Sequence, residues 1–320
     1  MKYDYSATPP RINDLTELAI LLESTQEKIA KIINKPSLFY REFKIKKRSG
    51  TDRIIQAPKP ELSFIQKNIY RNILSCVTLS DAAHGFVAGR SIVTHANCHI
   101  NGREFLLTDI KDFFPSINLA KIINIFAVMG YNHDISTVLG LLTNYKDGLP
   151  QGAPTSPILS NIAALLLDVR LSEFAKNNQL IYSRYADDMS FSGDHVNFAL
   201  LNQIALLIAH EGFEINNEKS LVATNRGKII ITGISLSRGR LHLPRESKRN
   251  LRKDVFFMLK NGIIKESCFE NILDPLYVDR LMGRLSFWLQ IEPTNEFALK
   301  NFRMLKKLVS SQTLSRAVIK

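Results

Sequence analysis

Apolar residues are distributed along this chain in patterns that predict helices and short strands in irregular succession. Apolar positions recur every three to four residues in the segments predicted to be helices, which are residues 13–34, 62–77, 119–129, 133–143, 156–176 and 197–211. Shorter apolar runs predict strands at residues 41–46, 52–57, 104–110, 180–185 and 189–192, with further short strands near 213–215, 220–223, 228–231 and 240–243. From residue 245 onward the pattern is helical. Because strands and helices mix without regular β-α-β alternation, the predicted fold class is α+β.

The composition is that of a globular chain with room for two or three subdomains. Of its 320 residues, 45% are hydrophobic and 22% are charged, which excludes a disordered or fibrous protein. The longest unbroken apolar runs, such as residues 162–167, are far shorter than the roughly 20 residues of a membrane span. The N-terminus lacks the apolar segment of a signal peptide, so we expect a cytoplasmic protein with no membrane partner. Three scattered cysteines without a Cys-x-x-Cys pair argue against a disulfide framework or a zinc module.

The net charge of +12 is distributed unevenly along the chain. Residues 226–320 carry 19 Lys and Arg against 8 Asp and Glu, and residues 41–71 carry 9 against 3. Between them, residues 72–225 carry 9 against 14. An acidic middle between two basic flanks suits a polyanion that is bound on both sides of a cation site. On charge alone, a solvated basic surface without a partner is the alternative.

Two segments place carboxylates at the ends of apolar strands. Asp109 ends the predicted strand 104–110, and Asp187 and Asp188 occupy a tight turn between two other strands. Hard divalent cations such as Mg²⁺ prefer such oxygen ligands, and two-metal sites need carboxylates that converge from separate elements. We therefore predict that the three aspartates are catalytic and bind two Mg²⁺ ions, one beside an attacking hydroxyl and one beside a triphosphate. Ordinary turn chemistry is the alternative for an isolated Asp pair, but the flanking strands and the second strand-end Asp argue against it.

At these residues the sequence resembles the reverse transcriptases. Tyr185, Ala186, Asp187 and Asp188 are similar to the catalytic hairpin of that family, and Asp109 with Phe113 and Phe114 resembles the motif of its first metal-binding Asp. Further segments follow in the family's order: 53–58 resembles the fingers motif, 149–157 the motif against nucleotide and template, 211–219 the motif after the catalytic hairpin, and 231–233 the primer-gripping element. The resemblance covers residues 44–243 and implies an RNA-directed DNA polymerase.

The resemblance implies a right-hand polymerase fold with an antiparallel palm sheet. It assigns residues 1–92 to the fingers with an N-terminal helix, 93–117 to the first part of the palm, 118–150 to the second part of the fingers, 151–238 to the palm with the catalytic hairpin, and 239–320 to a helical thumb. The 87 residues that follow Gly233 suffice for such a thumb, so we expect no fused RNase H, integrase or endonuclease domain.

Further residues are predicted to surround the carboxylates. The backbone carbonyl of Ile110 is expected to join the metal ligands. Phe114 stands where the family has a steric gate against a ribose 2′-OH, with Phe113 packed inside. The predicted nucleotide contacts are Arg53 and Lys46 beside a basic hairpin tip (Lys47, Arg48), Gln151 and Gly152 with a closely approaching backbone, and Lys219 as a general acid or phosphate contact. The alternatives are a solvated hairpin tip, an ordinary loop leading into a helix, and a surface lysine.

Within the reverse transcriptases, the likeness is greatest to the bacterial retron enzymes. These carry an Asn-Ala-x-x-His signature and a Val-Thr-Gly signature, where this chain has residues 95–99 (His-Ala-Asn-Cys-His) and 231–233 (Ile-Thr-Gly), each differing in its first residue. The resemblance implies a cognate noncoding RNA as template and primer, dNTP substrates and priming from an RNA 2′-OH. It further implies an RNA–DNA hybrid as msDNA product, and antiphage defence with a separate effector protein.

Residues outside the carboxylate region are predicted to bind RNA or template–primer. His95 and His99 are four residues apart, and they are interpreted as structural histidines or, from the resemblance, as residues that recognise the cognate RNA. Thr232 and Gly233 belong to the predicted primer-gripping element. A basic helix face is formed by Arg245, Lys248, Arg249, Arg252 and Lys253, and we predict that it binds template–primer or structured RNA.

Three other functions remain open from the sequence. A group II intron-like or other defence-associated reverse transcriptase would share the same palm. An RNA-dependent RNA polymerase is disfavoured by Phe114 and by Ala186 in place of Gly. A non-catalytic RNA-binding scaffold is disfavoured by Asp109, Asp187 and Asp188, because their mutual repulsion costs stability without metal.

Overall fold

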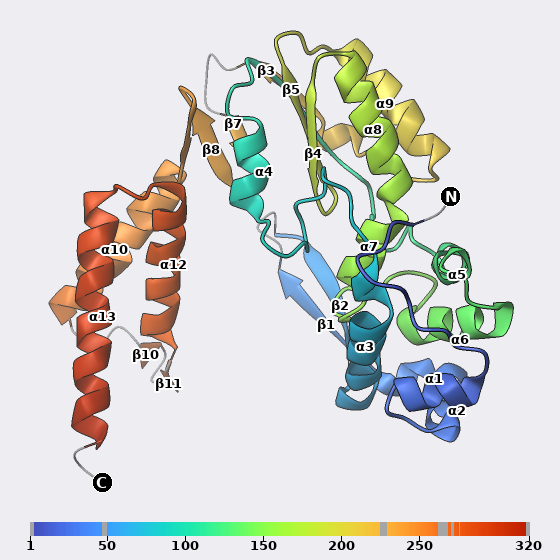
Figure 1. Ribbon diagram of the computed structural model, residues 1–320. Coiled ribbons are helices and arrows are strands. Elements are labelled where there is room, and N and C mark those ends of the chain that lie inside the picture. The colour runs from blue at the N-terminus through green and yellow to red at the C-terminus, as the bar shows by residue number, and fades with distance from the viewer. Residues whose placement is uncertain are drawn as a thin grey trace. The chain divides into compact units, whose positions relative to one another are not determined.

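The computed structural model describes residues 3–46, 50–224, 229–261, 268–269, 272–274 and 276–317 (Figure 1). The chain divides into two compact units. The first unit comprises Met1–Ser91 and Gly102–Ala223, and the second comprises Ile92–Asn101 and Thr224–Lys320. Helices and mostly antiparallel strands mix in both, which confirms the predicted α+β class. The finer assignment to fingers, palm and thumb stays a prediction.

A four-stranded sheet organises the first unit. Its strand order is β4 (Ile181–Tyr185), β5 (Asp188–Gly193), β3 (Glu104–Asp109) and β6 (Leu221–Thr224). Strand β5 pairs antiparallel with both β4 and β3. Helix α8 (Leu165–Asn177) packs against β4, and α9 (Phe198–His210) packs against α8 (Figure 1). Residues 189–192 of β5 are all buried, and because successive side chains point to opposite faces, both faces of this strand are covered.

The remaining elements of the first unit surround a continuous apolar core. They are α1 (Leu15–Leu21), α2 (Gln26–Asn34), η1 (Pro36–Phe39), the hairpin of β1 (Tyr40–Lys46) and β2 (Asp52–Pro58), α3 (Pro60–Asn72), η2 (Leu74–Cys76), α5 (Leu119–Val128), α6 (His133–Thr143), α7 (Ser156–Ala163) and η3 (Asn217–Lys219). Polar side chains fix several helix starts by accepting hydrogen bonds from first-turn N–H groups: Asp14, Thr25, Asn118, Asn132 and Asn197.

Two helices predicted to be continuous are each broken in two. The helix expected at 13–34 ends after Leu21, because Glu23 takes a φ of +52° and Thr25 caps the start of α2. The helix expected at 156–176 is interrupted at Ala164, whose ψ of 1° separates α7 from α8. In both cases the apolar periodicity continues across the break, so the sequence pattern conceals it.

The second unit combines a three-stranded antiparallel sheet with helices. Strands β7 (Ile229–Ile231), β8 (Ile234–Ser237) and β9 (Arg240–His242) pair in that order, with α4 (Ile92–Cys98) against β7 and β8. Helices α10 (Arg245–Asn261), α12 (Tyr277–Ile291) and α13 (Glu296–Ala317) pack together with α12 in contact with both others (Figure 1), and Trp288, Leu285 and Leu281 of α12 are buried. A short hairpin is formed by β10 (Cys268–Phe269) and β11 (Ile272–Leu273).

Some details of the second unit correct the sequence predictions. Strand β8 was not predicted, because its turn is Thr232–Gly233 rather than a common Asn-Gly or Asp-Gly turn. Both turn residues take positive φ, +43° and +83°, as a two-residue hairpin requires. The prediction of helix from residue 245 onward is wrong at β10 and β11. Across the described ranges, no helix has both the length and the apolar character needed to span a membrane.

Candidate active site

Strand register brings the three predicted catalytic carboxylates to one place in the first unit. Asp109 at the end of β3 lies directly opposite Asp188 at the start of β5. Residues paired in this way have Cβ atoms about 5 Å apart. The amide of Ile110 donates a hydrogen bond of 3.0 Å to the carbonyl of Asp187, which holds the turn against β3. The predicted convergence of Asp109, Asp187 and Asp188 is therefore a consequence of antiparallel pairing.

A buried arginine, Arg184, donates a hydrogen bond to the turn that carries Asp187. Ala186 has a φ of +57°, a conformation that costs energy for a residue with a Cβ. Nη1 of Arg184 donates a hydrogen bond of 2.9 Å to the carbonyl of Ala186. The other guanidinium nitrogens donate to Asp168 on α8, from Nε at 2.8 Å and from Nη2 at 2.6 Å. Arg184 and Asp168 are completely buried, so this pair connects the turn to the core.

A second segment approaches the same turn from residues 82–86. The amide of Arg184 donates to the carbonyl of Ala82, and the amide of His84 donates to the carbonyl of Arg184, both at 2.7 Å. Any Cβ on Gly85 would lie 2.6 Å from the backbone nitrogen of Ala186, a distance that no side chain could accommodate. Glycine is thus required at this position, and the residue that follows it is Phe86.

A cleft of about 720 Å³ collects most of the predicted site. Its lining includes these predicted residues: Asp109, Ile110, Asp187, Asp188, Arg53, Phe114, Gln151 and Lys219. Phe113 is only 3% exposed and Phe114 is partly exposed, and both rings line the cleft. The role of Phe114 as a gate stays a prediction. Phe86 also lines the cleft, and the sequence analysis did not identify it.

The carboxylates of this cleft carry more negative charge than their surroundings compensate. Desolvation in the cleft, together with the neighbouring charges of Asp187 and Asp109, raises the pKa of Asp188 to about 6. Desolvation and the charge of Asp109 also raise the pKa of Asp187. Lys219 donates a hydrogen bond to Oδ2 of Asp109, and this bond raises the pKa of the lysine. Oδ1 of Asp109 is buried and has no hydrogen-bond partner.

This donor set fits a hard divalent cation. Carboxylate and carbonyl oxygens are the ligands that Mg²⁺ prefers, and the partnerless Oδ1 of Asp109 is an oxygen that a cation would satisfy. The side chains are not already closed into a cage: within the described residues, no three acidic, His or Cys side chains are gathered tightly enough to enclose an ion. The ammonium of Lys219 supplies positive charge at this place.

The hairpin of β1 and β2 contributes one wall of the cleft. Arg53 lies on β2 and is exposed to the cleft, whereas Lys46, at the end of β1, is not part of its lining. Lys47 and Arg48 of the predicted basic tip lie outside the described residues. The amide of Gln56 donates a hydrogen bond of 2.8 Å to the carbonyl of Gln151, which joins the two walls.

Gly152 is also absent from the cleft lining. Its φ is +133°, and a Cβ there would lie 3.1 Å from the carbonyl oxygen of Gln56. The close approach that this glycine permits is therefore to strand β2. A contact between Gly152 and a nucleotide stays a prediction.

The predicted RNA-binding residues all lie in the second unit. His95 and His99 are completely buried, with ring centroids 5.8 Å apart, so the interpretation as structural histidines agrees with their burial. A role of these histidines in RNA recognition stays a prediction. Because both side chains are buried, such a role would be indirect, through their effect on the position of α4. Thr232 and Gly233 form the turn between β7 and β8, where Gly233 is exposed.

The predicted basic face of α10 separates into two rows. Lys248 and Arg252 turn toward the helical core: Lys248 pairs with Glu292 at 2.6 Å, and the guanidinium of Arg252 lies 5.6 Å from the ring centroid of Trp288. Arg245, Arg249 and Lys253 form the other row, with a spacing of four residues, and all three are exposed, as is Arg252. A polyanion in contact with α10 would therefore meet these four exposed side chains first.

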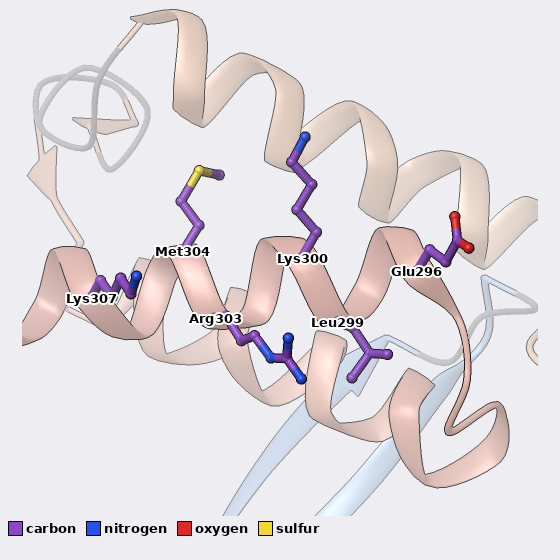
Figure 2. A pocket seen from close by; sticks show the side chains of 6 residues that line it. All are labelled: Glu296, Leu299, Lys300, Arg303, Met304 and Lys307. Atoms are coloured by element: carbon purple, nitrogen blue, oxygen red, sulfur yellow. The ribbon is translucent and has the colours of Figure 1, made fainter.

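Helix α13 adds basic side chains that the sequence analysis did not single out. Lys300, Arg303 and Lys307 line a shallow hollow of about 480 Å³ on this helix (Figure 2). Leu299 and Met304 supply its apolar part, and Glu296 lies at one end (Figure 2). These three basic residues are spaced three to four positions apart, as expected for side chains on one face of a helix. The sequence analysis predicted a helix in this region but did not examine which of its basic residues share a face.

Comparison with known proteins identifies the family. Residues 45–246 match the family described as reverse transcriptase (RNA-dependent DNA polymerase). The Retron Mx65 reverse transcriptase of Myxococcus xanthus is 37% identical over 235 residues, which cover 67% of this chain but only 54% of that relative. The Retron Ec86 reverse transcriptase of Escherichia coli is 32% identical over 313 residues, which cover 96% of this chain and 94% of that relative.

Among solved structures, the foamy viral protease–reverse transcriptase in complex with double-stranded DNA aligns with 97% of this chain. The alignment covers 46% of that chain at 16% identity, and its TM-score of 0.46 is too low to carry an argument. The family match and the retron relatives are sufficient by themselves. This chain belongs to the reverse transcriptases, and within them to the bacterial retron type.

Proposed function

We propose that this chain is the RNA-directed DNA polymerase of a retron. It copies part of a cognate noncoding RNA into single-stranded DNA by attack of a primer hydroxyl on the α-phosphate of a dNTP. The observation that supports this proposal best is the pairing of Asp109 with Asp188 beside Asp187, in a cleft that also contains Arg53 and Lys219. Charges of both signs around one cleft are what a triphosphate substrate requires.

The proposed metal ligands are the carboxylates of Asp109, Asp187 and Asp188 and the carbonyl of Ile110. Two Mg²⁺ ions held there would supply Lewis-acid stabilisation of the attacking and leaving oxygens. Desolvation and the neighbouring Asp187 and Asp109 raise the pKa of Asp188 to about 6, so a cation that binds this carboxyl group below that pH would have to displace a proton from it.

The residues around the carboxylates have separate proposed tasks. Arg53 binds the triphosphate through its planar fork of donors, and Lys46 adds positive charge at the hairpin. Lys219 holds a proton that it can donate near the leaving pyrophosphate. Phe114 excludes the 2′-OH of a ribonucleotide, and Gln151 orients the nucleotide from the opposite wall.

The likeness to retron reverse transcriptases supports the finer parts of the proposal. The cognate RNA serves as template and primer, synthesis begins at an RNA 2′-OH, and the product is branched msDNA. The substrates are available in the cytoplasm, where we place the reaction. We further propose a role in antiphage defence together with a separate effector protein.

The test is to purify the protein from cells that express its native locus and to characterise the bound nucleic acid. Samples are treated separately with RNase, DNase and a debranching enzyme. The control is the protein with Asp187→Asn and Asp188→Asn. We expect a short DNA joined to RNA in the wild type and RNA without DNA in the control. RNA alone in both samples would overturn the retron proposal and favour another reverse transcriptase or an RNA-binding scaffold.

A further inference from the structure

One residue of the cleft has no role in the site described so far. Phe86 is 46% exposed, although it is a large apolar side chain beside charged groups. Its φ is +61°, in the left-handed region where a bulky residue is a genuine outlier. Such strain persists only where the surrounding structure imposes it, and strained residues concentrate at functional sites. The exposure and the backbone strain of Phe86 therefore both indicate that its ring contacts a ligand.

The loop that carries Phe86 is fixed on both sides. Arg90 closes it from one side, because its Nη1 donates to the carbonyls of Ser80, Asp81 and Ala83 at 2.8, 3.0 and 2.7 Å. On the other side, Nδ2 of Asn161 donates a hydrogen bond of 2.8 Å to the carbonyl of Gly85. The ring of Phe86 is thus presented from a rigid loop, and little conformational freedom remains to be lost on binding.

Two further rings lie next to Phe86. Its centroid is 6.2 Å from that of Phe114, with planes at 74°, and 6.3 Å from that of Tyr185, with planes at 42°. Tyr185 directly precedes the turn of Asp187, so this aromatic cluster borders the carboxylates. These edge and tilted contacts leave part of the Phe86 ring open to the cleft. An open aromatic face beside a catalytic centre is a surface on which a nucleobase can stack.

We propose that Phe86 is a nucleobase-stacking residue that positions the template–primer beside the carboxylates. The inference rests on the proposed polymerase function. The base belongs to either the template strand or the primer end, and both offer the same π-face to the ring. Stacking of this kind tolerates every base, so Phe86 contributes to affinity and alignment and not to sequence preference.

Tryptophan fluorescence provides the test. The chain contains a single tryptophan, Trp288, which is completely buried in the second unit. In the Phe86→Trp variant, the tryptophan fluorescence that remains after subtraction of the wild-type fluorescence comes from position 86. We expect it to be quenched when an RNA template with a dideoxy-terminated DNA primer is added without dNTPs. The matched control is Phe198→Trp, an exposed position on α9 outside the cleft, whose signal should not change.

Abasic nucleotides distinguish the two sources of the base. If an abasic site at the templating position removes the quenching, the template base stacks on the ring. If an abasic site at the primer 3′ end removes it, the primer base does. Either result supports the proposal. Quenching that survives both substitutions, or no quenching while the wild type extends the same primer, would overturn it.

A second set of variants separates stacking from folding. Phe86→Asn removes the ring and suits positive φ, so its melting temperature should equal or exceed that of the wild type. We expect it to bind the duplex roughly 5- to 150-fold more weakly, as loss of one stacked base implies. Phe86→Tyr should restore binding and Phe86→Leu should not. Equal binding by all four proteins would overturn the inference, and failure of the wild type to extend any primer would overturn the proposed function with it.

Discussion

Two groups of carboxylates in the first unit differ in how their charges are compensated. Asp168 is completely buried, and it accepts hydrogen bonds from Tyr182 and twice from Arg184. In the cleft, Asp188 has like charges as neighbours and a pKa raised to about 6, and Oδ1 of Asp109 has no partner. The fold therefore gives the buried carboxylate of Asp168 a counter-charge, the guanidinium of Arg184. The carboxylates of the cleft together keep an excess of negative charge. Uncompensated charge of this kind is typical of a functional site whose ligand supplies the missing opposite charge.

The largest expected effect comes from removing a charge in the cleft. We expect Asp187→Asn to lower templated DNA synthesis about a thousandfold or more, since lost metal stabilisation is worth several kcal/mol and about 1.4 kcal/mol is tenfold in rate. The metal-free variant should melt no lower than the wild type, because one of several repelling charges is gone. Primer extension and thermal melting measure the two effects. A variant with full synthesis would remove Asp187 from the catalytic group.

Breaking the buried pair should have the opposite signature. Asp168→Ala leaves the Arg184 guanidinium buried without its partner, and this should cost about 3–5 kcal/mol of unfolding free energy. The double variant Arg184→Met with Asp168→Leu should recover much of that loss, because two apolar side chains replace two charges. Denaturant unfolding measures both. If the single variant is as stable as the wild type, Asp168 is not the counter-charge that the structure indicates.

A third effect should appear in the pH dependence of the second unit. Burial alone would raise the pKa of Glu292, but hydrogen bonds from Lys248 and from the amide of Leu243 lower it below its usual value. Because the folded-state pKa is depressed, the stabilisation is present above the unfolded pKa and is lost as the pH falls through the folded value. Melting between pH 6 and pH 3, with Glu292→Gln as the comparison, should show a smaller decline in the variant. Parallel curves would contradict this.

The smallest expected effect concerns an exposed ion pair on the hairpin of β1 and β2. Nζ of Lys46 lies 3.6 Å from Asp52, and the two side chains are 81% and 38% exposed. Lys46→Ala should therefore change stability by less than about 0.5 kcal/mol while raising the KM for dNTP severalfold. Arg103→Ala, in another exposed pair far along the chain, is the matched control and should change neither quantity. An unchanged KM for Lys46→Ala would leave that residue with a surface role only.

The position of the cleft carboxylates could be predicted because local pattern and pairing agree at these residues. The apolar runs of 104–110, 180–185 and 189–192 correspond to the strands β3, β4 and β5. Asp109 ends β3, Asp188 begins β5, and Asp187 lies in the turn between β4 and β5. Hard ligands at strand ends are visible in a sequence. The register that places Asp109 opposite Asp188 then follows from antiparallel pairing.

Other features depend on contacts that the local pattern does not contain. Phe86 reaches the cleft because Arg90 and Asn161 fix its loop and Gly85 lies against Ala186. Lys248 and Arg252 of α10 lie over the ring of Trp288 on α12, a contact that the periodicity of α10 alone does not reveal. The same limitation explains the break at Ala164, where the apolar periodicity continues although the helix does not.

The most direct test of the difference between the two carboxylate groups is cation-dependent melting of the assembled complex. The protein is combined with RNA template, dideoxy-terminated primer and the next dNTP, so that the complex forms without reaction. We expect Mg²⁺ to raise the melting temperature of the wild type by a few degrees and to leave the protein with Asp109→Asn and Asp187→Asn unchanged. An equal rise in melting temperature in both proteins, or no rise in the wild type, would show that the cleft carboxylates do not bind divalent cations.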